Sequence, residues 1–206
     1  MKIIYIMGKS SSGKDTIYNV LNKKLDVSTY VMYTTRPIRD GEVDGVTYNF
    51  ISQDEMQDYI DGNKGDGVIE YRTYKTVYGP WTYATIGDGQ FDVKKDMLML
   101  GTLESYEKVK GYFANRQNVE LMPIYVEVPD NIRLKRAIER EEKEINPKYV
   151  ELCRRFIVDS KDFLEENLQK VGIGKRFQNL DLNKCVNEII CYIERENKRF
   201  SEKERD

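Results

Sequence analysis

Near the start of the chain, residues that could bind phosphate stand at a fixed spacing. Gly8 and Gly13 enclose four residues and Lys14 follows, so the pattern G-x-x-x-x-G-K is complete. The glycines let successive backbone N–H groups turn toward an anion, and the lysine adds a positive charge for β- and γ-phosphates. The candidate nucleotide-binding residues are therefore Gly8, Ser10, Ser11, Ser12, Gly13, Lys14, Asp15 and Thr16.

The setting of this loop supports a phosphate site. The apolar run at residues 2–7 predicts a buried strand, and Ile17, Leu21 and Leu25 recur at helical spacing directly after the loop. A turn from strand to helix places an anion at the N-terminus of the helix, where the backbone N–H groups are unpaired. The alternative is an ordinary Gly/Ser-rich turn with a surface lysine.

The residue after Lys14 departs from the usual motif. A hydroxyl is expected there, but the chain has Asp15, and Thr16 comes one place later. A carboxylate beside a triphosphate would be repelled unless Mg²⁺ lay between them. We hypothesise that Asp15 holds Mg²⁺ while Thr16 bonds a phosphate oxygen; the alternative is that Asp15 only caps the helix.

Composition excludes several classes of protein. With 206 residues the chain fits one α/β domain with insertions, and its net charge of −2 gives no basic field for nucleic acid or an acidic membrane. There is no histidine, which argues against a zinc site or a Ser-His-Asp hydrolase. The three cysteines lack C-x-x-C spacing, and the apolar N-terminal run is too short for a signal peptide. We expect a cytoplasmic protein with reduced cysteines.

The pattern of predicted elements indicates a parallel core with an insertion. Strands are predicted at 27–33, 97–100, 121–128 and, weakly, 175–178. Helices are predicted at 15–25, 102–112, 130–142 and 149–168. A last helix is expected to begin from an N-cap at Asp181, and the charged tail from Ser201 is expected to be frayed. Between them, Ser52 and Glu55 form a capping box for a short helix, and 68–74 and 76–85 predict a strand pair. Strands that follow one another without a helix predict an antiparallel insertion.

The insertion begins with a second possible anion site. Arg36 and Arg39 lie close to Tyr48, and arginine forks match phosphate bidentately while a tyrosine hydroxyl adds a neutral donor. A monophosphate could be held there. The alternative is a turn whose arginines lie on a solvated surface.

At this point the residues resemble a family. The run from Thr34 to Glu42, with Gly45, Tyr48 and Ser52, is similar to the T-T-R-x-P-R-x-G-E-x-x-G-x-x-Y-x-F-V-S signature of guanylate kinases, although the proline stands one place early. The resemblance extends through the N-terminal loop, a V-I-E-Y segment at 68–71 and the Tyr78-Gly79 pair. It implies a P-loop nucleoside monophosphate kinase that transfers the γ-phosphoryl group of ATP to GMP or dGMP with Mg²⁺.

The resemblance also implies roles for single residues in binding the acceptor. Glu70 would accept hydrogen bonds from N1–H and the amino group of guanine, which adenine cannot offer; the alternative is a strand glutamate that faces water. The implied acceptor-binding residues are Arg36, Arg39, Glu42, Tyr48, Glu70 and Tyr78.

Three positions depart from the family pattern where it would touch the base. Met32 stands in place of a serine, and Pro80 stands in place of a Ser/Thr after Tyr78-Gly79. The strand that usually carries an aspartate ends at Gly101. The sequence therefore predicts base recognition that is weaker or built differently.

Arginines on the later helices could stabilise phosphoryl transfer. Arg133, Arg136 and Arg140 share one helical face, and guanidiniums from a closing lid neutralise charge on the transferring group. The alternative, strongest for Arg133, is a set of surface ion pairs with the interleaved glutamates. By resemblance, the predicted catalytic residues are Lys14, Arg136, Arg140 and Arg155.

These predictions define an arrangement in three parts. The P-loop core is expected at 1–32, 87–128 and 156–206, the acceptor-binding insertion at 33–86 and the lid at 129–155. ATP and GMP are the expected small-molecule partners, without nucleic acid or membrane, for a monomer or homodimer. Two rival functions stay open: a kinase for another nucleoside monophosphate or a sugar phosphate, and a non-catalytic guanylate kinase-like binding module.

Overall fold

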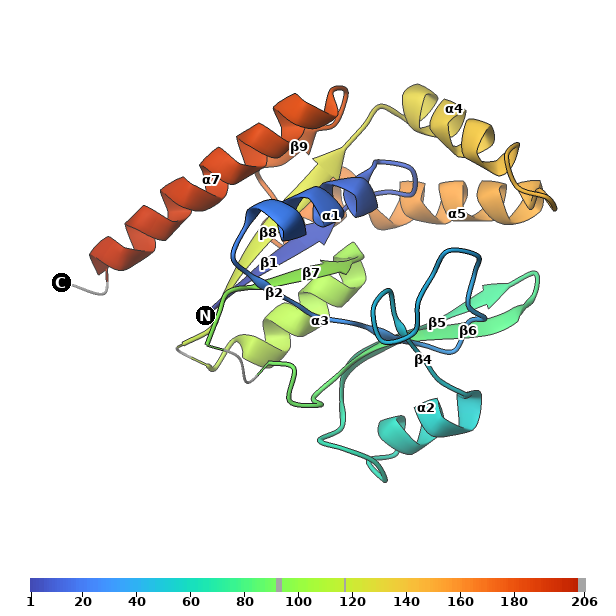
Figure 1. The fold of residues 1–206 in the computed structure, drawn as a ribbon, viewed down its shortest axis with the longest axis horizontal. Coiled ribbons are helices and arrows are strands. Elements are labelled where there is room, and N and C mark those ends of the chain that lie inside the picture. Colours follow the sequence, from blue (N-terminus) through green and yellow to red (C-terminus); the bar gives the residue numbers. More distant parts are fainter. Residues whose placement is uncertain (92–93, 117, 204–206) are drawn as a thin grey trace.

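Strands and helices alternate through most of the chain in the computed structural model, which describes residues 1–91, 94–116 and 118–203. Five strands form a wholly parallel sheet in the order β2-β7-β1-β8-β9 (Figure 1). They are β2 (Ser28–Thr29), β7 (Met97–Gly101), β1 (Lys2–Met7), β8 (Glu120–Glu127) and β9 (Arg176–Gln178). The predicted parallel α/β core is confirmed, since each of these strands is joined to the next in the sheet in parallel register.

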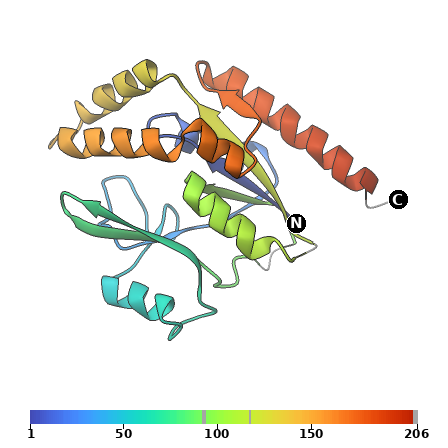
Figure 2. The same cartoon turned by 180° about the vertical axis from the view of Figure 1, so that it is seen from behind.

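The central strand β1 is buried on both faces because helices cover both sides of the sheet. Ile3 and Tyr5 belong to the apolar cluster that includes α3 (Leu103–Phe113) and α6 (Glu165–Lys170). Ile4 and Ile6 point to the opposite face, where α1 (Lys14–Lys24) and α7 (Leu182–Lys203) pack. Figures 1 and 2 show these helix pairs on opposite sides of the sheet. Within the described part of the chain, no helix is long and apolar enough to cross a membrane.

The insertion forms a second sheet, in the order β4-β3-β6-β5. Its strands are β3 (Tyr33–Thr34), β4 (Asn49–Phe50), β5 (Val68–Thr76) and β6 (Gly79–Ile86). β5 and β6 pair antiparallel, as predicted, and β6 also pairs antiparallel with β3. The prediction of a purely antiparallel insertion is wrong in one detail, because β3 and β4 run parallel. α2 (Gln53–Ile60) covers this sheet, and the Ser52 hydroxyl accepts the Glu55 N–H as the capping pattern predicts.

The chain crosses from the first sheet to the second at Tyr30. The sequence predicts one strand over 27–33, but the structure has β2 and β3 instead, because the chain leaves the first sheet after Thr29 and enters the second at Tyr33. The Tyr30 hydroxyl accepts the Ile86 N–H at 2.7 Å and donates to the Ile86 carbonyl at 2.9 Å. One buried side chain therefore ties the outgoing segment of the insertion to the returning one.

Two helices, α4 (Asp130–Glu141) and α5 (Tyr149–Asp162), pack together beyond the carboxyl ends of the core strands (Figures 1 and 2). The predicted helix over 149–168 is interrupted, because Phe163 turns inward and stacks on Tyr125 with ring centroids 5.5 Å apart. α6 starts only after this break. The predicted frayed tail also differs: α7 continues through Ser201 to Lys203, and residues 204–206 lie outside the described residues.

Candidate active site

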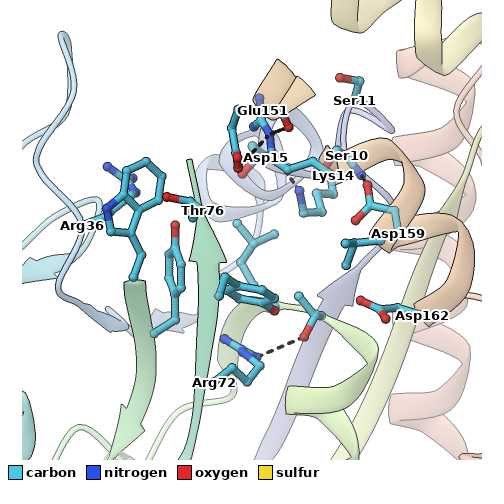
Figure 3. Close-up of a pocket in the computed structure, with 18 of the residues that line it drawn as sticks. Ser10, Ser11, Lys14, Asp15, Arg36, Arg72, Thr76, Glu151, Asp159 and Asp162 are labelled. Atoms are coloured by element: carbon cyan, nitrogen blue, oxygen red, sulfur yellow. Dashed lines mark hydrogen bonds and ion pairs between the residues drawn. The ribbon is translucent and has the colours of Figure 1, made fainter. Parts of the chain in front are cut away.

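A cleft of about 570 Å³ lies where the two sheets and the α4–α5 pair meet. One wall is the loop between β1 and α1, and the opposite wall is the second sheet. Side chains from α4 and α5 complete it. Figure 3 shows Lys14 and Asp159 on one side and Arg36 on the other. The two predicted anion sites thus face one shared space.

Backbone conformation and close packing require the two glycines of the loop after β1. Gly13 has a φ of +83°, a left-handed conformation that side chains disfavour. Gly8 packs so closely on β8 that a Cβ atom there would lie 2.5 Å from the Val126 carbonyl oxygen. Ser10, Ser11, Gly13, Lys14, Asp15 and Thr16 line the cleft, whereas Gly8 and the buried Ser12 support the loop from behind.

Two side chains brace this loop through its carbonyl groups. Arg133 Nη1 donates to the Ser10 carbonyl at 3.1 Å, and Asn179 Nδ2 donates to the Ser12 carbonyl at 2.8 Å. Arg133 also pairs with Asp130 at 3.0 Å and is only 1% exposed, so the alternative of a surface ion pair is wrong for this residue. These two donors fix the carbonyl groups of the loop, while the Ser12 N–H donates to the Lys9 carbonyl at 3.1 Å.

A carboxylate from α5 reaches the loop. The Ser10 N–H donates to Asp159 Oδ2 at 2.6 Å, and Arg133 Nη1 lies 3.4 Å from the same oxygen. The Asp159 side chain is only 18% exposed. In Figure 3 Asp162, one turn further along α5, points into the same space. The sequence predicted neither residue for the site, although Arg155, Asp159 and Asp162 share one helical face at spacings of four and three.

Lys14 and Asp15 stand at the start of α1. Lys14 Nζ lies 3.2 Å from Asp15 Oδ2, and this positive charge lowers the pKa of Asp15 below its ordinary value. Asp15 remains ionised at neutral pH and its side chain is 68% exposed. Gly13, not Asp15, occupies the N-cap position of the helix. The Asp15 carboxylate is thus open to a ligand in the cleft.

On the opposite wall, Arg36 is held by a carboxylate. Arg36 donates bidentately to Glu42, with Nη1–Oε2 at 2.6 Å and Nη2–Oε1 at 2.5 Å, and the Arg39 N–H also donates to Glu42 Oε2 at 2.9 Å. Burial raises the pKa of Glu42, but hydrogen bonds and the charge of Arg36 outweigh it and lower the pKa. Glu42, predicted to bind the acceptor, holds Arg36 in place and is not among the described residues that line the cleft, whereas Arg36 and Arg39 are.

Tyr48 sits against the same arginine. Its ring centroid lies 4.9 Å from Arg36 Cζ, within cation–π range. Burial raises the pKa of Tyr48 to about 12, so its hydroxyl stays protonated at neutral pH. Tyr48 lines the cleft and is chemically able to donate to an anion there.

Positive groups from α4 and α5 complete the upper wall. Arg136, Arg140, Arg154 and Arg155 all line the cleft. Burial lowers the pKa of Arg155, and the like charges of Arg140 and Arg39 lower it further. Arg154 is paired with Glu151 at 2.6 Å, whereas the like charges of Arg155, Arg140 and Arg39 repel one another across the cleft, which favours an anion between them.

Two further predicted acceptor residues do not line the cleft. Tyr78 is at the β5–β6 turn, 53% exposed, stacked on Trp81 at 6.1 Å with Lys148 Nζ 4.8 Å from its ring centroid. The Glu70 side chain is fully enclosed, so the alternative in which it faces water is wrong. Neither residue is among the described residues that line the cleft, whereas Arg72, Tyr74 and Thr102 are.

The missing strand carboxylate has a steric explanation. A Cβ atom on Gly101 would lie 2.1 Å from the Tyr5 hydroxyl and 2.7 Å from Ser105 Oγ. These two hydroxyls bond each other at 2.6 Å below the strand end. No side chain fits at this position while that pair is present.

These features define a class of protein. A parallel sheet, a glycine-lysine phosphate loop at its carboxyl edge and an arginine-lined cleft are the parts of a P-loop kinase. The fold is similar to the crystal structure of guanylate kinase from Anaplasma phagocytophilum, with a TM-score of 0.59 and 17% identity, covering 95% of this chain and 86% of that one.

The family model for guanylate kinase matches residues 1–151, and the chain belongs to the guanylate kinase family. It is a nucleoside monophosphate kinase, a phosphotransferase. Guanylate kinase of Clostridium tetani is 29% identical over 77% of this chain and 78% of its own length. That of Mesomycoplasma hyopneumoniae strain 7448 is 26% identical over 95% of both chains, and that of Sulfurimonas denitrificans is 30% identical over 80% and 78%.

Proposed function

We propose that this enzyme transfers the γ-phosphoryl group of ATP to GMP or dGMP, giving ADP and GDP or dGDP. The observation that carries the proposal is the single cleft shared by the Lys14 loop and the Arg36–Arg39 pair. One cradle suits the donor polyphosphate and the other suits the acceptor monophosphate. The names of the relatives support guanine as the acceptor base.

Catalysis in this proposal consists of positioning and charge neutralisation. Lys14 and the loop's N–H groups hold the donor phosphates, and Arg36, fixed by Glu42, holds the acceptor phosphate. Arg136, Arg140 and Arg155 neutralise charge on the transferring group as residues 129–155 close as a lid. The acceptor phosphate is already ionised at neutral pH, so the reaction needs no histidine as a base.

The residues present fit Mg²⁺ delivered with ATP. Within the described part of the chain, no three His, Cys, Asp or Glu side chains form a metal cage. Mg²⁺ commonly takes one or two carboxylates and completes its shell with phosphates and water. The exposed, ionised Asp15 beside Lys14 would hold it. When bound, the ion would neutralise the donor phosphates.

A coupled ADP-release assay across GMP, dGMP, AMP, UMP and ribose 5-phosphate tests the proposal. GMP or dGMP should give the highest kcat/KM. Lys14→Ala should lose at least about a hundredfold, because the charge on the transferring phosphates is left unneutralised. Lys23→Ala, exposed in the last turn of the same helix, is the matched control. Preference for a different acceptor, or no ADP release with any guanine nucleotide, would overturn the assignment.

Calorimetry separates this enzyme from a binding module. The intact loop should bind ATP, and Lys14→Ala should weaken that binding while circular dichroism shows an unchanged fold. A protein that folds but binds no ATP would be a module and not a kinase.

A further inference from the structure

The end of the cleft away from the phosphate loop carries a cation at its floor. Arg72 on β5 lines the cleft there with Met32, Tyr74 and Thr102. Figure 3 shows Arg72 at the floor, apart from both Lys14 and Arg36. Because the phosphates belong with those other two cations, Arg72 faces the part of the acceptor that is not phosphate.

The carboxylate of Glu70, two residues before Arg72, is covered. Glu70 Oε1 accepts from the Thr85 hydroxyl at 2.9 Å and lies 3.5 Å from Arg72 Nη1. Its side chain is 0% exposed and is not among the described residues that line the cleft, and its buried Oε2 has no hydrogen-bond partner. Residues two apart on a strand share a face, and here the arginine stands between the glutamate and the cleft.

Arg72 is itself only 4% exposed, so a ligand can meet only the edge of its side chain that lines the cleft. Its Nη1 donates to Thr102 Oγ1 at 3.1 Å, while its buried Nε has no hydrogen-bond partner. The Thr102 hydroxyl also accepts the Ser105 N–H as the cap of α3, which fixes its position. An arginine so anchored offers donors, and no acceptors, to a base.

We propose that Arg72 is the residue that selects the acceptor base, by donating to the O6 and N7 atoms of guanine, with Glu70 and Thr102 positioning it. This inference rests on the proposed function. O6 and N7 are adjacent acceptors that match a guanidinium fork. Adenine presents an amino group beside N7, so a donor would meet a donor. Selection thus depends on a different edge of the base from the one Glu70 would read directly.

Acceptor analogues tested on the unmodified enzyme distinguish the two edges. IMP keeps O6 and N7 but lacks the 2-amino group, so it should keep a kcat/KM within about threefold of GMP. The analogue 7-deaza-GMP lacks N7 and should lose about tenfold or more, since a hydrogen bond to a charged group is removed. The reverse order, with IMP poor and 7-deaza-GMP unaffected, would show that Glu70 reads the base and would overturn the inference.

Arg72→Gln provides a second test, because glutamine matches N6 and N7 of adenine. The ratio of kcat/KM for GMP to that for AMP should fall at least about tenfold, while the KM for ATP stays within twofold. Arg72→Gln combined with Glu70→Gln should show the same fall without leaving a buried carboxylate unpaired. Lys75→Gln, exposed on the same strand, is the control and should leave the ratio unchanged.

The outcomes of these tests are separable. Two results would refute the role of Arg72 and leave the proposed function standing. In the first, the unmodified enzyme phosphorylates GMP but shows the reverse analogue order. In the second, Arg72→Gln has the same GMP-to-AMP ratio of kcat/KM as the unmodified enzyme. An enzyme with no activity on any guanine nucleotide refutes the proposed function, and the role of Arg72 with it.

Discussion

The carboxylate of Asp159 makes a sharp prediction, because it occupies a donor of the phosphate loop. Its Oδ2 accepts the Ser10 N–H at 2.6 Å, and its side chain is only 18% exposed. A polyphosphate entering the loop must compete for that donor and also approach a fixed negative charge. Asp159→Asn keeps the shape of the side chain and removes the charge, so ATP should bind more tightly when no Mg²⁺ is present to bridge the two anions.

The magnitude follows from the contact. A hydrogen bond to a charged acceptor contributes about 1.5–3 kcal/mol, and a neutral one about 0.5–1.5 kcal/mol. A polyphosphate should therefore displace the neutral asparagine from the Ser10 N–H at a cost that is lower by about 1.4 kcal/mol. This difference corresponds to about tenfold tighter binding of ATP. The loop should keep its shape in the variant, because Arg133 still bonds the Ser10 carbonyl and Asp130.

Isothermal titration calorimetry with ATP in excess EDTA measures this effect. Asp162→Asn is the control: it also removes a negative charge from the cleft, but Asp162 accepts no hydrogen bond from the described part of the loop, and the gain should stay below about threefold. Equal or weaker ATP binding by Asp159→Asn would refute the reasoning. That result would show that the polyphosphate and the carboxylate do not compete for Ser10.

Three further predictions concern stability and reactivity. Glu42→Gln should lower the free energy of unfolding by about 2–3 kcal/mol at pH 7, because Arg36 loses a charged, bidentate partner. The folded protein lowers the pKa of Glu42 below its ordinary 4.5, so this stabilisation is complete above pH 4.5 and is lost as pH falls through the lowered pKa. Urea unfolding of both proteins at about pH 7 and at about pH 3.5 should therefore show a smaller difference in unfolding free energy at the lower pH. An equal difference at both pH values would contradict the prediction. Gly101→Ala should cost about 1–3 kcal/mol through its clash with Tyr5, measured by thermal unfolding, whereas an unchanged melting temperature would show that the strand end can shift. Titration of the native protein with a thiol reagent should count two fast cysteines, Cys153 and Cys191, because burial raises the pKa of Cys185 to about 11; three fast thiols would contradict its burial.

Sequence reasoning succeeded where the signal is local. The run before Gly8, the glycine spacing and the Ser52 cap each depend on neighbours in the chain, and the structure confirms the elements they predict. The predicted single helix over 149–168 failed because its break has no proline or glycine. Phe163 leaves the helix to stack on Tyr125, a partner 38 positions away that no local pattern reveals.

The site residues that sequence reasoning missed have meaning only through distant neighbours. Arg72 looks like any polar strand residue until β5 is placed beside Thr102. Asp159 looks like a surface helix residue until α5 lies against the loop at Ser10. Glu70 was predicted from its flanking letters, but the side chain that covers it decides what it can touch.

The tie made by the Tyr30 hydroxyl has a mechanical consequence. The two segments that join the insertion to the core are fastened to each other here, by Tyr30 to Ile86 and by the Gln90 side chain to the Val31 backbone, so β3 and β6 keep their relative positions where both leave the core. A shift of the insertion relative to the core would move Arg36 and would also stretch the 3.1 Å bond that holds Arg72 to Thr102, so the positions of the two arginines are coupled. Tyr30→Phe removes one of these ties and should therefore weaken acceptor binding, measured as a higher KM for the acceptor.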